Sequence, residues 1–246
     1  MARLKEYNGH YCESEYEYAF IGFLEAEGWK YSSGNNISRV TKRDVLIADD
    51  FKKFIADTNP DLTEDEVIQI YQQIMDTVRL AGAESDFATL HKVYGWMVNG
   101  VQFTPQDELP RMIPLIDFDN WDKNIFRVVN QFTVEYTNNG QKENRRPDVL
   151  LFVNGMPLCV VELKNPVDAN ATIYDAWEQI NIRYWRDIPH LLHYCPLACI
   201  SDGVKTRLGT VRTPYEHFYA WRRVNEGDAV STLPFAETET MIKGVY

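Results

Sequence analysis

The chain has 246 residues, of which 45% are hydrophobic and 25% charged, enough for one substantial core. No apolar run approaches the roughly 20 residues of a membrane span, and no basic segment followed by an apolar one opens the chain. We therefore expect a cytoplasmic domain without membrane contact. The formal charge of -11 argues against a protein that holds nucleic acid through an overall basic surface.

The first half of the chain is predicted to be helical. An amphipathic helix is expected from Glu13 to Gly28, where the glycine ends it. Thr63 and Glu66 have the spacing of a capping box, which favours a helix at 63–81. Two further helices are expected at 44–57 and 85–99. We interpret residues 40–104 as an α-helical insertion.

The second half combines strands with one longer helix. Strands are predicted at 111–117, 125–136, 148–153 and 158–163, a helix at 173–186, and strands at 197–202 and 205–209. A hairpin followed by a helical crossover gives a mixed sheet, so the predicted fold class is α/β with helices flanking a mixed β-sheet. We treat 1–246 as a single domain and interpret 210–246, which is rich in aromatic side chains, as a connecting tail.

Three charged residues lie at the ends of the hairpin predicted at 148–163. Asn154-Gly155 is a strong turn signal between its two apolar strands. Asp148 begins the first strand, while Glu162 and Lys164, two residues apart, share one face of the second. Burying these charges without partners would be costly. Either Asp148 caps a turn and the other two form a solvated ion pair, or a site provides the partners.

A divalent cation and a phosphate or water would be suitable partners. Mg²⁺ takes one or two protein carboxylates together with phosphate oxygens. A lysine beside it can orient the attacking water or neutralise developing charge. This chemistry is metal-dependent hydrolysis of a phosphodiester. The spacing of Pro147-Asp148 and Glu162-Leu163-Lys164 matches the pattern of the PD-(D/E)xK nucleases.

A longer stretch carries a more specific resemblance. Residues from about Asn130 to Asn170, the following Ala171–Gln179, and the later Ile200–Gly203 and Arg207–Thr210 resemble the nuclease domain of the type I restriction endonuclease R (HsdR) subunit. The resemblance implies a restriction-endonuclease-like fold. It also implies that Asp148, Glu162 and the main-chain carbonyl of Leu163 bind Mg²⁺ and that Lys164 is the catalytic lysine.

Two further features of that family match less closely. The family has a Gln-x-x-x-Tyr motif on the helix after the catalytic strand, but here Gln179 is followed by Tyr184, one residue further. Five residues turn an α-helix by about 500°, so either the helix is locally distorted or Tyr184 lies elsewhere. Many nucleases of this fold also have a metal-binding carboxylate on the first helix. Glu17 is the candidate for this ligand, and Glu13 and Glu15 are neighbouring alternatives. The other interpretation is that these acids form a solvated face of the helix.

The implied substrate is double-stranded DNA, cut without sequence preference. Three arginines near the predicted site are candidate phosphate contacts: Arg145, Arg146 and Arg183. Gln179 and Tyr184 are further candidates for contacting DNA. The chain has no Gly-x-x-x-x-Gly-Lys-Ser/Thr motif. The resemblance therefore implies an N-terminal fragment whose ATP use lies in translocase domains outside these residues, with modification and specificity subunits as partners. The alternatives are another PD-(D/E)xK nuclease, or a non-enzymatic domain of the same fold that docks the motor through its aromatic tail.

Overall fold

A six-stranded mixed sheet forms the centre of the protein in the computed structural model, which describes residues 13–80, 85–164, 172–230, 233 and 235–245. Residues 165–171, part of the stretch that carries the resemblance, lie outside this description, as does the side chain of Glu13. The strands are ordered β1 (Lys30–Ser33), β4 (Phe126–Asn130), β7 (Val149–Val153), β8 (Met156–Leu163), β9 (Leu197–Ser201) and β10 (Thr206–Thr210). The pairs β1/β4 and β8/β9 are parallel and the others antiparallel, which confirms a mixed α/β sheet.

The β7–β8 hairpin is the most deeply buried part of this sheet. All five residues of β7 are buried, as expected for a strand covered on both faces. Asn154 and Gly155 both have positive φ, as a type I′ turn requires. A Cβ on Gly155 would lie 2.3 Å from the carbonyl oxygen of Ile47, so only glycine fits here. The predicted hairpin is confirmed.

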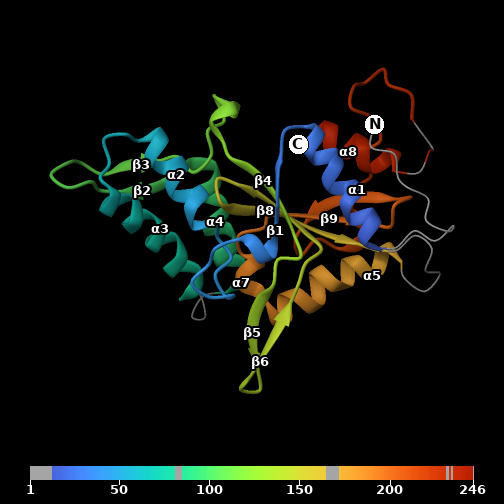
Figure 1. Ribbon diagram of the computed structural model, residues 1–246, viewed down its shortest axis with the longest axis horizontal. Helices are drawn as coiled ribbons and strands as arrows, with labels where there is room; N and C mark the ends of the chain where they lie inside the picture. The colour runs from blue at the N-terminus through green and yellow to red at the C-terminus, as the bar shows by residue number, and fades with distance from the viewer. Residues whose placement is uncertain (1–12, 81–84, 165–171, 231–232, 234, 246) are drawn as a thin grey trace.

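Helices cover the two faces of the sheet differently (Figure 1). Helix α1 (Glu13–Ala26) packs beside α8 (Ala236–Val245), and the hydroxyl of Tyr16 contacts Ser201 of β9. Ser201 is the register partner of Leu163, so α1 lies on the Leu163 face of β8. On the opposite face, where Glu162 points, the chain forms α5 (Ile173–Glu178), a π-helical turn (Gln179–Tyr184) and α6 (Trp185–Asp187).

Three helices lie together beside the sheet (Figure 1): α2 (Ala48–Thr58), α3 (Glu64–Arg79) and α4 (Asp86–Asn99). A small hairpin of β2 (Val101–Phe103) and β3 (Arg111–Ile113) follows them. The capping box is confirmed, because the Thr63 and Glu66 side chains bond each other's backbone N–H groups. Arg127 on β4 donates two hydrogen bonds to Asp50, which fixes α2 to the sheet. Whether 40–104 is an insertion into a smaller fold stays a prediction.

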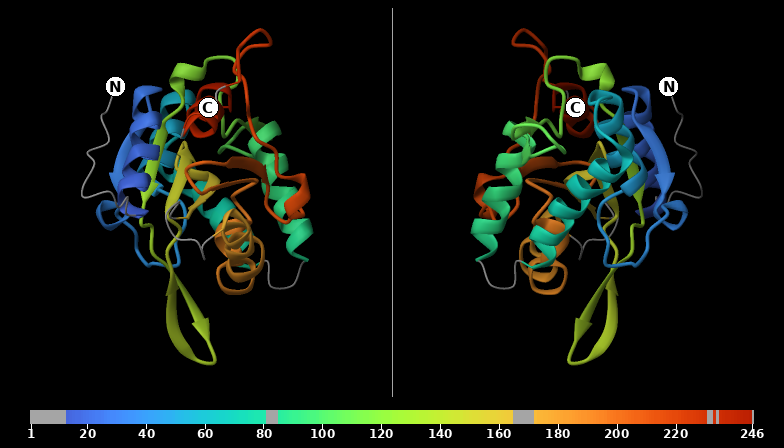
Figure 2. Two further views of the ribbon diagram at one scale, coloured as in Figure 1. Left: turned by 90° about the vertical axis from the view of Figure 1, so that its right-hand side faces the viewer. Right: turned by 90° about the vertical axis from the view of Figure 1, so that its left-hand side faces the viewer.

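Several elements differ from the sequence-based expectation. The strand predicted at 125–136 is two strands, because the chain turns at Gln131, which has φ of 54°. Its second part, β5 (Val134–Asn138), pairs with β6 (Gln141–Arg145) in a hairpin that projects from the body in both views of Figure 2. Strands β1, β2 and β6 were not predicted, and neither was α8, which lies within the expected tail. Within the described residues, no helix has the length and apolar character needed to cross a membrane.

Candidate active site

Asp148 and Glu162 come together at one end of the β7–β8 hairpin. Asp148 lies just before β7, and its Oδ2 accepts a hydrogen bond of 2.8 Å from the backbone N–H of Leu163. Glu162 lies on β8 and its side chain is 0% exposed. Burial raises the pKa of Glu162 well above its usual range, and the nearby charge of Asp148 raises it further. The hairpin register thus places two acids in one enclosed site.

Lys164 completes the predicted triad on the same face. The strand β8 ends at Leu163, and the N–H of Lys164 still bonds the carbonyl of Ser201 at 2.8 Å, so its backbone is held in the sheet. The ammonium lies 3.9 Å from Glu162 Oε2 and donates to Gln179 Oε1 at 2.9 Å. The Lys164 side chain is only 15% exposed and Glu162 is fully buried, so a solvated surface ion pair does not describe this arrangement.

The π-helical turn explains the unusual spacing of Gln179 and Tyr184. Gln179 Nε2 donates to Glu162 Oε2 at 2.7 Å, and the Tyr184 hydroxyl donates to Glu162 Oε1 at 2.5 Å. The two side chains also touch each other, with 3.0 Å between Gln179 Nε2 and the Tyr184 oxygen. A π turn closes hydrogen bonds between residues i and i+5, so residues five apart lie on one side of the helix. The helix is therefore locally distorted, and this distortion keeps Tyr184 next to Gln179.

Glu17 lies near this site but on the other face of the sheet. Its two carboxylate oxygens accept hydrogen bonds of 2.6 Å from Asn130 Nδ2 and Gln131 Nε2. Gln131 in turn donates its N–H to the carbonyl of Asp148 at 3.0 Å. Among the described residues, no three His, Cys, Asp or Glu side chains form a group that could hold a metal, so Glu17 is not united with Asp148 and Glu162. Its role as a ligand stays a prediction.

The candidate DNA-contacting arginines differ in whether they are paired or exposed. Arg145, at the end of β6, forms an ion pair of 2.6 Å with Asp187 at the end of α6. Arg146 and Arg183 are exposed, on the segment before β7 and on the π turn respectively. The pairing of Arg145 with Asp187 joins residues 42 positions apart, and no local sequence signal indicated it.

The donor set fits a divalent cation. Two carboxylates that repel each other in an enclosed site are stabilised when a cation lies between them. Asp148 and Glu162 provide these oxygens. Leu163 directly follows Glu162 in sequence, and its backbone N–H bonds Asp148. Gln179 and Tyr184 donate hydrogen bonds to Glu162, and the Lys164 ammonium lies 3.9 Å from the same carboxylate. Such a set could hold a hard cation together with an anionic substrate.

Comparison with known proteins identifies relatives of this chain. Residues 11–217 match the family described as type I restriction enzyme R protein N terminus. A Methanocaldococcus jannaschii protein named as the MjaIXP endonuclease subunit of a type I restriction enzyme is 33% identical over 88% of this chain and 21% of its own length. The HindI endonuclease subunit of Haemophilus influenzae is 29% identical over 95% of the chain and 22% of its own. The chain spans about a fifth of the length of these relatives, and it belongs to the family of type I restriction enzyme R protein N-terminal regions.

Proposed function

We propose that this chain is the Mg²⁺-dependent endonuclease domain of a type I restriction enzyme R subunit, which cuts double-stranded DNA without a sequence preference of its own. One observation carries the proposal: Glu162 is fully buried, yet Asp148, Lys164, Gln179 and Tyr184 all converge on it. A structural role alone would not favour two acids and a lysine in an apolar sheet, because apolar side chains would be less costly there. This argues against a purely non-enzymatic domain.

The residues have distinct parts in the proposed reaction. Asp148, Glu162 and the Leu163 carbonyl hold Mg²⁺, which when bound activates water and stabilises charge on the scissile phosphate. Lys164 orients the attacking water and balances negative charge as the leaving oxygen departs. Gln179 fixes the Lys164 ammonium and one oxygen of Glu162, while Tyr184 fixes the other oxygen. These bonds preorganise the carboxylate before substrate arrives.

The relatives are named as endonuclease subunits, and each is about five times longer than the region that matches this chain. The activities of a whole R subunit therefore involve further domains. We infer that translocase domains of the same protein use ATP and deliver DNA to this domain in the cytoplasm. Modification and specificity subunits would choose the target. The net charge of -11 supports weak binding by this domain alone, since DNA affinity depends strongly on cationic contacts.

Cleavage of a supercoiled plasmid in Mg²⁺ tests the proposal, with Lys164→Ala compared with wild type in the R subunit and its partners. We expect Lys164→Ala to lose cutting by at least about a hundredfold while its fold is unchanged, because a single preorganised donor contributes on that order. Lys53→Ala is the matched control, since Lys53 is 64% exposed on α2 and forms a surface ion pair with Asp57. Undiminished cutting by Lys164→Ala would reject the catalytic role.

A further inference from the structure

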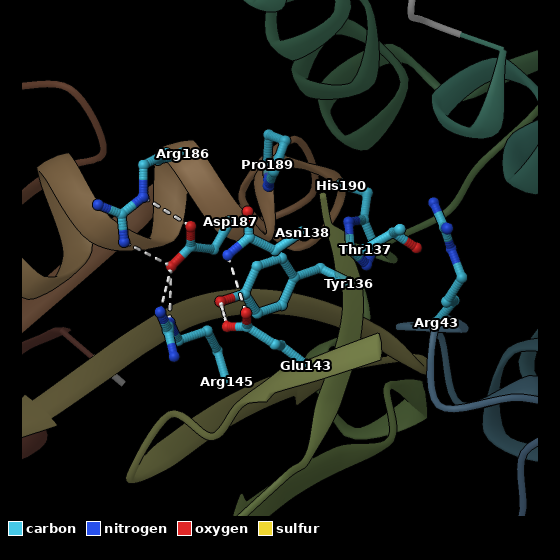
Figure 3. Close-up of a pocket in the computed structure, with 10 residues that line it drawn as sticks. All are labelled: Arg43, Tyr136, Thr137, Asn138, Glu143, Arg145, Arg186, Asp187, Pro189 and His190. Carbon is cyan, nitrogen blue, oxygen red and sulfur yellow. Dashed lines mark hydrogen bonds and ion pairs between the residues drawn. The ribbon is translucent and has the colours of Figure 1, made fainter. Parts of the chain in front are cut away.

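A second charged pocket lies beside the candidate active site. Its volume is about 580 Å³, and it opens between the β5–β6 hairpin, the end of α6 with α7 (Pro189–Leu192), and the turn that carries Arg43 (Figure 3). Three arginines line it, with Arg145 and Arg186 on one side and Arg43 on the other. Nothing in the proposed cutting mechanism uses Arg43 or Arg186.

The two carboxylates in the pocket are already occupied. Asp187 is only 6% exposed and accepts hydrogen bonds from Arg145 Nε and Arg186 Nε, both at 2.7 Å. Glu143 accepts from the Tyr136 hydroxyl at 2.5 Å and from Asn138 at 2.8 Å. The side chains of Arg145 and Arg186 are 32% and 65% exposed. Each of these two guanidinium groups contacts Asp187 through two nitrogens, so their remaining N–H groups, rather than the acids, are what the pocket presents to a ligand.

Arg43 and His190 have unused hydrogen-bonding capacity. The Arg43 turn is fixed in place, because Thr41 N–H bonds Asp44 and Glu135 N–H on β5 bonds the carbonyl of Lys42. Nevertheless, within the described part of the chain Arg43 bonds through its backbone N–H, to Thr41 Oγ1, and its guanidinium forms no hydrogen bond or ion pair there. His190 Nε2 is buried and likewise has no partner there.

The pocket is attached to the active site through two short segments. Arg145 lies three residues before Asp148, so their Cα atoms are at most about 11 Å apart even in a fully extended chain. Asp187 lies three residues after Tyr184, along the same helical segment. Each strand of a duplex carries one phosphate per roughly 3.4 Å of helix axis. A duplex with its scissile bond at Asp148 and Glu162 can thus reach the pocket with its own backbone.

We infer that this pocket binds a backbone phosphate of the DNA duplex, away from the scissile bond, through Arg43, Arg145 and Arg186. The inference rests on the proposed nuclease function and extends it to the substrate's backbone. Guanidinium groups match phosphate oxygens in a two-pronged geometry, which suits them to this ligand. Phosphate contacts position DNA without reading sequence. The pocket would therefore set the register of the duplex at a site that has no sequence preference.

The test compares two double variants that remove equal charge. Arg43→Ala/Arg186→Ala empties the pocket of two cations and leaves the Arg145–Asp187 link intact. Arg222→Ala/Arg223→Ala is the matched control, on exposed residues of the segment between β10 and α8, and neither lines the pocket. Binding of a 30-base-pair duplex is measured by fluorescence anisotropy in EDTA over a series of salt concentrations.

We expect the pocket variant to bind about tenfold more weakly than the control. Its plot of log affinity against log salt should be shallower by about 0.9, the value for one lost phosphate contact. Arg43→Lys/Arg186→Lys should recover most of that slope, because the charges are restored. Equal affinity and slope in the pocket and control variants would overturn the inference, as would a wild-type protein that binds no duplex at low salt. Lys164→Ala cleavage reports on the nuclease proposal separately.

Discussion

Gln179 and Tyr184 are five residues apart, yet they hydrogen-bond the two oxygens of one carboxylate, Glu162. The π-helical turn between them makes this possible, because an α-helix would rotate the second side chain away. Single π turns inside helices are frequent at functional sites. In this chain the turn accommodates one extra residue without loss of the contacts to Glu162.

The first prediction concerns that extra residue. Deleting Ile182, which is 50% exposed on the π turn, should convert the turn to α-helix and keep both contacts to Glu162. We expect the free energy of unfolding to change by less than about 1 kcal/mol, in the range of surface substitutions. An alanine inserted after Ile182 is the control, and it should cost more than about 2 kcal/mol by separating donors from a buried carboxylate. Thermal unfolding of both proteins measures this change. An equal loss of stability in the deletion and insertion variants would contradict the role given to the π turn.

The second prediction concerns the paired acids. Asp148→Asn removes one of two like charges in an enclosed site, so in EDTA it should unfold at a higher temperature than wild type, by about 1 kcal/mol in stability. Mg²⁺ should then raise the unfolding temperature of wild type but not of the variant, because ligand binding stabilises only the state that binds it. If Mg²⁺ raised the unfolding temperature of both proteins by a similar amount, Asp148 would not be a metal ligand.

The third prediction concerns Glu17. Glu17→Ala leaves the amides of Asn130 and Gln131 without their acceptor, which should lower the free energy of unfolding by about 1–3 kcal/mol. Because the carboxylate lies across the sheet from Glu162, we expect Mg²⁺ affinity to fall much less than in Asp148→Asn. Calorimetric titration of both variants measures this. Equal loss of affinity would establish Glu17 as a metal ligand.

The fourth prediction concerns pH. Burial, followed by the charge of Arg43, lowers the pKa of His190 from 6.5 to about 4. The folded state therefore prefers the neutral ring. Its stabilising contribution is complete above pH 6.5 and is lost as the pH falls from 6.5 towards 4.

Since His190 is half-buried, we expect that loss to be about 1–2 kcal/mol. His190→Gln should flatten the pH dependence of chemical denaturation in this window, whereas His217→Gln, at an exposed position, should not. An unchanged pH profile in His190→Gln would contradict the burial of a neutral ring.

Local signals in the sequence predicted the centre of the site. Asn154-Gly155 specifies its turn through its own backbone, and alternation along a strand places Glu162 and Lys164 on one face whatever surrounds them. The π turn could not be predicted from helix propensity, because contacts with Glu162, a residue on another element, accompany it. The irregular spacing was its only sequence signal.

The features that the sequence did not predict are those whose partners lie far away along the chain. Strand β1 is four residues long and pairs in parallel with β4, about a hundred residues later, so its own sequence carries little periodicity. Glu17 is held by Gln131, 114 positions away, and Arg145 by Asp187. Such pairings follow from the folded sheet. Neighbouring residues in the sequence do not indicate them.

The most direct test of the metal-dependent site is a Mg²⁺ titration by calorimetry with duplex DNA present, in wild type and in Asp148→Ala, with cutting measured on the same samples. We predict binding and cutting in wild type, and loss of both in Asp148→Ala and in EDTA. Cutting that persists in EDTA, or Mg²⁺ binding that is equal in the two proteins, would contradict the assignment of Asp148 and Glu162 as the metal-holding pair.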